Sequence, residues 1–338
     1  MAKILINKDS LQYLLDKFFL ENKECIKKEI RISQTKVICK FFTYGKDCQV
    51  DIHLLKDGIN PVCVGKNKEL ASILIRYLET KGTRDDQSSQ QIVIKNCNVI
   101  NDIIDYINSD FAGKITITTI NNRYVFTSFN NDKITITKND NNIVIQGKPY
   151  YTFNIVMTFI AGLDLISFDE YVGLGSQFSE EAYNANVIRD RIKHILKTSY
   201  IYMEEAQLKS ISGSFSFINS KIKSEDYSSP LTGVFKALEG YIKKLLTQKF
   251  NFKLKYNLSP FKKDKKTGKT EIDLRTDIMQ KDKDALYKLY STYCDKRNVY
   301  THSTVDPAQM RVIQNYKEAE ELRDEILEII EETYKIIF

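Results

Sequence analysis

In several short stretches of the first half of the chain, apolar and polar residues alternate one by one. The pattern is clearest in the two Ile-Thr-Ile-Thr segments that begin at Ile115 and Ile134. Because successive side chains on a strand point to opposite faces, this alternation predicts half-buried antiparallel strands. The expected strands cover residues 36–43, 49–54, 114–120, 123–129 and 133–138. The asparagine-rich segments 121–122 and 130–132 favour hairpin turns.

Two sequence blocks in this half resemble each other. Residues 62–66 read Val-Cys-Val-Gly-Lys and precede an apolar helical segment at 69–75. Residues 144–148 read Val-Ile-Gln-Gly-Lys and precede another at about 152–165. Strand-like segments come before both blocks. The first half is therefore predicted to contain a divergent repeat of two α+β modules, each a curved antiparallel sheet backed by helices.

The second half changes to apolar positions three and four residues apart, which is the period of an amphipathic helix. Within residues 281–302 these positions are Leu286, Leu289, Tyr290 and Tyr293. Similar spacing predicts further helices at 179–209, 230–250 and 307–336. The second half is therefore predicted to be an array of four helices.

Other features bear on membrane and nucleotide binding. The most apolar stretch, residues 150–168, is interrupted by Asn154 and Asp164, so it is predicted to be a buried helix rather than a membrane span. No apolar run of signal-peptide length opens the chain before Lys8. The Gly-Leu-Gly sequence at 173–175 lacks the third glycine of a dinucleotide site and is predicted to be a turn between domains. We expect a cytoplasmic protein with domains at 1–86, 87–172 and 173–338.

The six cysteines are scattered without C-x-x-C pairs, and the three histidines are dispersed. No zinc-ligand spacing appears. The cysteines are therefore expected to be reduced and buried, and neither a metal site nor a cofactor is predicted.

Residues 297–302 read Arg-Asn-Val-Tyr-Thr-His. Arginine stays charged at any working pH, whereas an ordinary histidine titrates at about 6.5. Arg297 therefore offers a permanent phosphate clamp, and His302 a switchable proton acceptor. Such a pair is suited to cleaving RNA without a metal. Asn298 lies four residues before His302 and shares its face on a helix.

Helix geometry sets a condition on this pair. At about 100° per residue, Arg297 and His302 are roughly 140° apart around a straight helix. They converge only if the helix ends or loosens near His302, which the poor helix formers at 303–305 allow. Otherwise the two residues are a surface arginine and a helix-terminal histidine without chemistry.

The net charge of +6 is unevenly distributed. Residues 207–270 hold fourteen lysines against four acidic residues, and residues 311–338 hold four basic against eight acidic residues. The basic stretch predicts an electrostatic footprint for RNA phosphates, with a solvated loop as the alternative. Its candidate RNA-binding residues are Lys236, Lys262, Lys263, Lys265, Lys266 and Lys269.

Four helices with Arg-Asn-x-x-x-His at the end of the third resemble the HEPN ribonuclease superfamily. The chain is more closely similar to the RnlA/LsoA type of bacterial ribonuclease toxin, over nearly its whole length. The similarity is strongest at 142–165, at the Leu-Glu-Gly sequence 238–240 and at 297–310. This resemblance implies an α+β chain in which two TATA-binding-protein-like modules precede an all-α HEPN domain of four helices.

The same resemblance implies an endoribonuclease toxin of an anti-phage toxin–antitoxin system. Its partners would be an RNA substrate, a cognate antitoxin, a second copy of the chain and ribonuclease HI. The resemblance also adds Glu239, because a glutamate in this block is implicated in cleavage. The family has an arginine three residues earlier, where this chain has Lys236. Lysine keeps the charge but loses the two-pronged fork of arginine.

In this interpretation Arg297 stabilises charge on the scissile phosphate. His302 accepts the proton of the attacking 2′-hydroxyl group or donates one to the leaving oxygen, and Asn298 orients His302 or the substrate. Two alternatives stay open. The first is a non-catalytic HEPN scaffold that binds RNA or protein, and the second is a DNA-binding regulator that uses the N-terminal modules. A toxic effect that depends on His302 would separate the ribonuclease from both.

Overall fold

The computed structural model describes residues 3–6, 10–85, 89–129, 131–176, 184–217, 227–254, 258, 260–263, 270–272, 278–297, 313 and 315–338. The chain divides into two compact units, and the division falls between Phe153 and Asn154. The first unit contains two antiparallel sheets with helices, and the second is largely helical. The α+β class is therefore confirmed, while the predicted domain boundaries at 1–86, 87–172 and 173–338 stay predictions.

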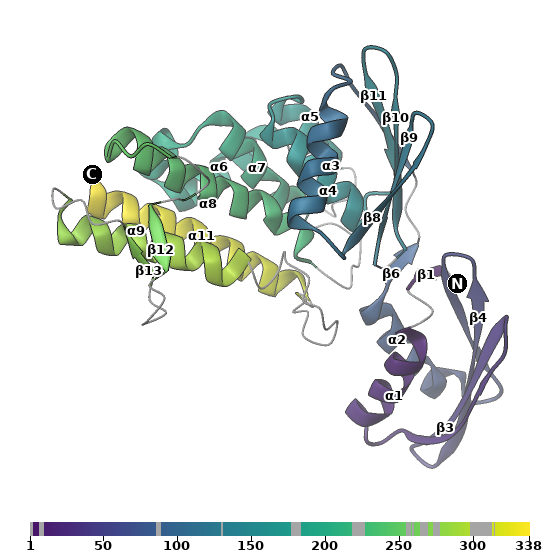
Figure 1. Cartoon of the computed structure of the whole chain (residues 1–338). Helices are drawn as coiled ribbons and strands as arrows, with labels where there is room; N and C mark the ends of the chain where they lie inside the picture. Colours follow the sequence, from purple (N-terminus) through teal and green to yellow (C-terminus); the bar gives the residue numbers. More distant parts are fainter. Residues whose placement is uncertain are drawn as a thin grey trace. The chain divides into compact units, whose positions relative to one another are not determined.

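The first sheet belongs to a module whose elements are β1 (Lys3–Leu5), α1 (Leu11–Glu21), β2 (Ile26–Ile32), β3 (Lys36–Thr43), β4 (Lys46–Leu55), β5 (Gly58–Val64), α2 (Lys68–Lys81) and β6 (Thr83–Asp85). Its strands pair in the order β2-β3-β4-β5-β1-β6. In β3 the side chains of Val37, Cys39 and Phe41 are buried, and the residues between them are partly exposed. Figure 1 shows α1 and α2 beside this sheet, and the ring of Phe18 in α1 lies 5.9 Å from that of Phe41.

The second sheet belongs to a module whose elements are β7 (Gln90–Ile94), α3 (Val99–Asp110), β8 (Ile115–Ile120), β9 (Arg123–Ser128), β10 (Lys133–Lys138) and β11 (Ile143–Gly147). Helix α4 (Tyr151–Gly162) follows, and its residues from Asn154 onward belong to the second unit. Its strands pair antiparallel in the order β8-β9-β10-β11-β7. The predicted hairpin turn at 121–122 is confirmed, because Asn121 has a φ of 54° and β8 pairs with β9 around it.

The two modules share one topology. Each begins with a strand and a helix and continues with four consecutive strands and a second helix; the first module has one more short strand, β6. In each, the first strand pairs with the last of those four, β1 with β5 and β7 with β11. The two matching sequence blocks, at 62–66 and 144–148, occupy equivalent places at or just after the end of β5 and β11. The repeat seen in the sequence is therefore also a repeat of topology.

The second unit is built around a set of helices. They are α5 (Phe168–Ser176), α6 (Ala185–Leu196), α7 (Glu205–Ser216), α8 (Thr232–Lys244), α9 (Gln280–Thr292) and α11 (Tyr316–Ile337). Short helical turns are η2 (Ser199–Tyr202) and η3 (Ser229–Leu231), and β12 (Phe261–Lys263) pairs with β13 (Thr270–Ile272). Figure 1 shows α9 and α11 running side by side, and α7 contacts α5, α6 and α8.

Two of these helices end in a wider turn. Helix α8 continues as a π-helical turn, η4 (Leu245–Lys249), and α9 continues as another, η5 (Tyr293–Arg297). A π-helical turn closes its hydrogen bonds over five residues instead of four, and such turns are frequent at functional sites. The predicted helix at 230–250 is confirmed as α8 with η4.

The prediction of a single helix over residues 179–209 is wrong. Helix α6 ends at Leu196, Lys197 has a φ of 44°, and α7 begins only at Glu205. The carboxylate of Glu331 in α11 accepts hydrogen bonds from the backbone N–H groups of Thr198 and Ser199. This contact with a distant helix stabilises the turn. The described part of the second unit therefore holds more than the four helices predicted from the sequence.

The prediction of a turn at residues 173–175 is also wrong, because these residues lie inside α5. A Cβ atom on Gly175 would lie 2.4 Å from the Cβ atom of Ser216 in α7. Glycine is therefore present there because two helices approach closely, and not because the chain turns. The predicted buried helix at 150–168 ends earlier, at Gly162, and Asp164 with a φ of 60° begins the connection to α5.

The prediction of a continuous helix over residues 307–336 is wrong as well. Asn315 is extended, with φ −147° and ψ 159°, and its side chain accepts a hydrogen bond from the backbone N–H of Glu318 at 2.9 Å. Asparagine in this position is a good N-cap. The described helix therefore begins at Tyr316, and residues 307–312 lie outside the described residues.

Candidate functional site

Two of the residues predicted to act in catalysis meet where α8 packs against α9. Glu239 lies on α8, and Arg297 ends the π-helical turn after α9. The hydroxyl group of Tyr293 donates a hydrogen bond to Oε2 of Glu239 at 2.7 Å. The guanidinium carbon of Arg297 lies 5.2 Å from the centre of the Tyr293 ring. Tyr293 therefore connects the predicted acid to the predicted cation.

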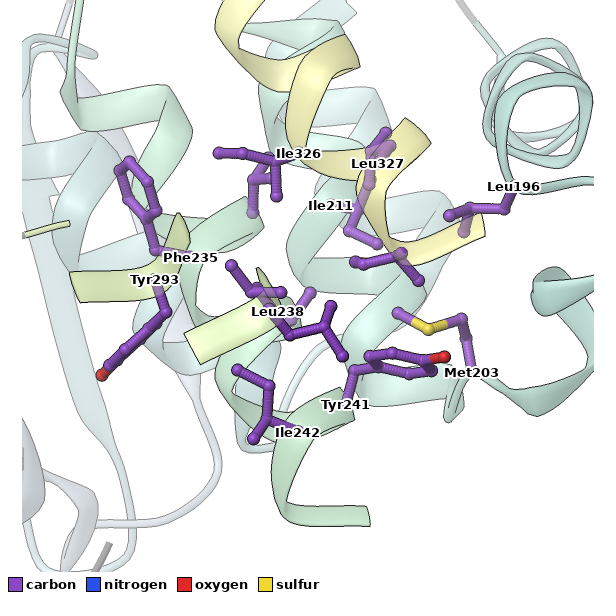
Figure 2. Close-up of a cluster of buried hydrophobic side chains, with 14 of the residues drawn as sticks. Leu196, Met203, Ile211, Phe235, Leu238, Tyr241, Ile242, Tyr293, Ile326 and Leu327 are labelled. Carbon is purple, nitrogen blue, oxygen red and sulfur yellow. The ribbon is translucent and has the colours of Figure 1, made fainter. Parts of the chain in front are cut away.

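The sequence Leu-Glu-Gly at 238–240 places Glu239 by packing its neighbours. Leu238 is fully buried in the core of the helical unit, where Figure 2 shows it among other apolar side chains. A Cβ atom on Gly240 would lie 2.7 Å from Nε2 of Gln207, so the glycine leaves room for that side chain of α7. Leu238 and Gly240 thus have packing roles. Glu239 is left partly exposed beside α9.

Both carboxylate oxygens of Glu239 have partners. Oε1 lies 2.6 Å from Nζ of Lys243, one turn later on α8, and Oε2 accepts from Tyr293. A pair four residues apart on a helix is common and contributes little to stability by itself. Together, however, the two contacts fix the orientation of the carboxylate. Neither partner was predicted from the sequence, although the spacing of four between Glu239 and Lys243 is visible there.

The end of α9 loosens before the predicted point. The widened turn covers Tyr293 to Arg297, whereas the sequence led us to expect loosening near His302. Residues four apart share a helical face, which explains why Arg297 lies over Tyr293. Asn298 and His302 lie outside the described residues. The convergence of Arg297 and His302 therefore stays a prediction.

Lys236 lies one turn before Glu239 on α8 and is partly buried. Its Nζ atom is 4.1 Å from the centre of the Phe159 ring, a distance typical of a cation–π contact. The aliphatic part of a lysine can pack on such a ring while the charged end keeps polar contacts. The position where the family resemblance implies an arginine is thus occupied by a cation that rests on an aromatic side chain.

The basic segment begins beside α9. The ring of Phe261, at the start of β12, stacks on that of Tyr290 with centres 4.0 Å apart and planes 1° apart. Lys262 and Lys263 follow in β12, while Lys265, Lys266 and Lys269 lie outside the described residues. The Phe261 contact therefore anchors the start of the lysine-rich segment to α9.

Tyr290 and Cys294 lie next to this contact. Burial raises the pKa of Tyr290 to about 12 and also raises the pKa of the Cys294 thiol. Both groups are therefore protonated at neutral pH. They act as packing and hydrogen-bonding groups there, and Cys294 is not a thiolate nucleophile.

The acidic last helix pairs with α9 inside the chain. Lys288 of α9 pairs with Glu332 of α11, and Lys296 pairs with Glu325 at 3.0 Å. The complementary charges seen in the sequence are thus used at least partly within one molecule. Lys296 is the neighbour of Arg297, so this pair also ties the π-helical turn to α11.

On the open face of the first sheet, several lysines that could contact nucleic acid are paired with acidic residues. Its lysines form ion pairs with acidic neighbours on the same face, namely Lys28 with Asp47, Lys36 with Asp51 at 2.7 Å, and Lys40 with Glu29 at 3.0 Å. These pairs neutralise one another across the strands. The contacts therefore give the predicted DNA-binding alternative no support at this face.

Membrane spans and metal clusters are both absent from the described part of the chain. None of its helices is both long and apolar enough to cross a membrane. No group of three or more His, Cys, Asp and Glu side chains able to hold a metal ion occurs among the residues that the structure describes.

Two family models match the chain. One is described as RNase LS, bacterial toxin, and matches residues 88–167. The other is described as RNase LS, bacterial toxin DBD domain, and matches residues 184–304, which include Glu239, Arg297 and His302. No curated protein sequence matches the chain.

Among solved structures, the chain is similar to the Escherichia coli toxin LsoA, seen in complex with the T4 phage antitoxin Dmd. The two share 21% sequence identity with a TM-score of 0.46, over 73% of this chain and 99% of that chain. Dmd is a partner of that toxin.

Proposed function

Because the chain belongs to the RNase LS family of bacterial toxins, we propose that it is an endoribonuclease toxin that cleaves RNA through attack of a 2′-hydroxyl group on the adjacent phosphate. The observation that carries the proposal is the convergence of Glu239 and Arg297 on Tyr293. Two helices that are distant in the sequence thereby bring a carboxylate and a permanent cation to the same tyrosine side chain.

The reaction needs one proton acceptor, one proton donor and stabilisation of the phosphate. A base takes the proton of the 2′-hydroxyl group, the oxygen forms a bond to phosphorus, and the bond to the 5′-oxygen breaks as that oxygen receives a proton. His302 is the proposed proton-transfer group, and Arg297 is proposed to stabilise the charge that develops on the phosphate. RNA supplies its own nucleophile. Asn298 is proposed to orient His302 or the substrate.

Glu239 and the lysines have supporting roles in this proposal. Glu239 lies close enough to the Arg297 turn to orient it or to take part in proton transfer. Lys236, one helical turn away on α8, is proposed to add positive charge near Glu239. The segment from Lys262 to Lys269 is proposed to contact RNA phosphates and to contribute affinity rather than chemistry.

We assign the two sheet modules to the TATA-binding-protein-like fold and the helical region to the HEPN fold. The support for the first assignment is the shared order of strand, helix, four strands and helix. The support for the second is the packing of α8 against α9 with Glu239 facing the turn that carries Arg297. The proposed partners are a cognate antitoxin, a second copy of the chain and ribonuclease HI.

The test is cleavage of RNA by the purified chain beside His302→Ala and Arg297→Ala. Loss of a proton-transfer group should lower the rate by about 10²–10⁴-fold. His194→Ala is the matched control, because His194 is an exposed residue near the end of α6, and it should cleave like the wild type. The fragments should carry 2′,3′-cyclic phosphate or 3′-phosphate ends, with or without EDTA.

Three outcomes would contradict the proposal. The first is near wild-type cleavage by folded His302→Ala, and the second is fragments with 3′-hydroxyl ends. The third is full loss of cleavage in EDTA. Binding of RNA without cleavage by the wild type would favour the scaffold alternative.

A further inference from the structure

We propose that Tyr293 is a positioning residue that holds the Glu239 carboxylate and the Arg297 guanidinium in a fixed relation to each other. The inference rests on the proposed ribonuclease function. Tyr293 would touch neither the phosphate nor the attacking oxygen. It would act through the two groups on either side of it.

The hydroxyl end of Tyr293 fixes the carboxylate. It donates to Oε2 of Glu239 at 2.7 Å, while Lys243 engages Oε1 at 2.6 Å. Lys243 lies on the same helix as Glu239, so it cannot relate that helix to α9. Tyr293 lies on the π-helical turn after α9 and makes this connection between the two helices. A hydrogen bond to a charged group is among the stronger ones in proteins.

The ring of Tyr293 supports the cation. The guanidinium of Arg297 lies 5.2 Å from the ring centre, within the range of a cation–π contact. Arginine stacks on aromatic rings because its guanidinium is planar and weakly hydrated. The contact limits the directions in which the Arg297 side chain can extend. One side chain thus orients an anion with its hydroxyl group and a cation with its ring.

Tyr293 is itself held firmly. It is 9% exposed and belongs to the apolar core of the helical unit, to which Leu238 and Phe235 of α8 also belong. Figure 2 shows its ring at the edge of that cluster, with the hydroxyl oxygen directed away from the other labelled side chains. A tyrosine can bury its ring and keep a polar contact at its tip. The core therefore sets the position of the ring, and the ring sets the positions of the charged groups.

The first experiment compares Tyr293→Phe and Tyr293→Leu with the wild type in RNA cleavage. Tyr293→Phe keeps the ring and removes the hydrogen bond to Glu239, so kcat should fall about tenfold with KM unchanged. Tyr293→Leu also loses the ring beneath Arg297, so kcat should fall further, and phenylalanine at this position should restore part of the loss. Tyr287→Phe, which removes the hydroxyl group of an exposed tyrosine of α9 and keeps the ring, is the matched control and should leave kcat unchanged.

The second experiment is a double-mutant cycle that needs no RNA. The wild type, Tyr293→Phe, Glu239→Ala and the double variant are unfolded in urea. The hydroxyl group should contribute less to stability once Glu239 is absent, so the two changes should be non-additive by about fivefold to tenfold in the unfolding equilibrium constant. The same cycle in kcat should show that Tyr293→Phe lowers kcat less when Glu239 is alanine than when Glu239 is present.

The outcomes separate the two proposals. A wild type that does not cleave RNA overturns the proposed function, whereas the unfolding cycle still tests the link between Tyr293 and Glu239. If the wild type cleaves RNA and Tyr293→Phe has full kcat, the positioning role of Tyr293 is wrong. Additive effects in the unfolding cycle overturn it as well, as does an equal loss of kcat in Tyr287→Phe.

Discussion

At the scale of single residues, two glutamates show how the environment decides the role of one residue type. Glu239 is partly exposed and points to the end of α9, whereas Glu331 is 4% exposed and holds a turn. The oxygens of Glu331 accept hydrogen bonds from Thr198 Oγ1 at 2.7 Å and from the Ser199 N–H at 2.8 Å. Burial alone would raise the pKa of Glu331, but these hydrogen bonds outweigh it and lower the pKa to about 2.

This shift gives a prediction about acid stability. A carboxyl group whose pKa is lowered by folding adds stability above its ordinary pKa, and that stability is lost as the pH falls toward the folded value. For Glu331 this stability should be lost as the pH falls from 4.5 to about 2. Glu331→Gln should therefore lower the free energy of unfolding at pH 7 by about 2 kcal/mol and flatten its pH dependence in that window.

Urea unfolding across this pH range measures both effects. Glu328→Gln is the matched control, because Glu328 is an exposed glutamate of the same helix, and it should unfold like the wild type. An unfolding free energy of Glu331→Gln that follows the wild-type pH dependence would show that the contact with Thr198 and Ser199 contributes no charge-dependent stability.

At the scale of elements, the π-helical turn and the lysine-rich hairpin both depend on α9. The turn carries Arg297, and the stack of Phe261 on Tyr290 ties the start of the hairpin to the same helix. Phe261 anchors the start of this hairpin in the core of the helical unit, and the lysines that follow it can be substituted without removing that contact. Binding and chemistry can therefore be separated by substitution.

The lysine segment gives the corresponding prediction. Changing the lysines at 262, 263, 265, 266 and 269 to serine should weaken RNA binding. The slope of log affinity against log salt should fall by roughly one for each phosphate that the variant no longer neutralises. The cleavage rate at saturating RNA should not change. The measurement is a salt titration of RNA affinity, for example by fluorescence anisotropy.

The first sheet supplies the control. Lys28→Ser with Lys40→Ser removes two lysines that already pair with acidic neighbours, so RNA affinity should stay close to the wild-type value. If the hairpin variant also keeps its affinity and its salt dependence, the segment is a solvated loop and does not bind RNA.

At the scale of the whole molecule, a single arginine and a single histidine form a sparse site for moving protons at two oxygens. Two copies related by a twofold axis would double the donors in one shared cleft, because such an interface joins identical patches. We therefore expect the active species to be a homodimer formed through the helical domain, and the antitoxin to cover this cleft or prevent the pairing.

Mixed dimers test this expectation. Arg297→Ala and His302→Ala, each inactive alone, should regain part of the wild-type rate when they are combined, since a shared cleft would then hold one intact arginine and one intact histidine. Light scattering over a dilution series should show the rate falling as the dimer dissociates. A monomer that cleaves RNA at the full dimer rate would exclude a shared site.

The sequence alone determined the parts of the fold that depend on local periodicity. Alternation around Ile115 and Ile134 predicted strands that the structure contains, and the spacing of Leu286 and Leu289 predicted α9. The family was also evident from its motifs, because Glu239 and the Arg297 block stand in order and are recognisable as sequence. These features rest on residue type and spacing, which a linear chain records directly.

Only the tertiary structure decided where the helices break and which side chains meet. The turn after Leu196 forms because Glu331, far away in the sequence, binds its backbone. Gly175 looked like a turn residue until Ser216 was found against it. Tyr293 looked like one more apolar position on a helix, yet its hydroxyl group reaches Glu239 on α8. Contacts between elements depend on distances that no local pattern encodes, so the partners of the candidate catalytic residues appeared only when the helices were packed.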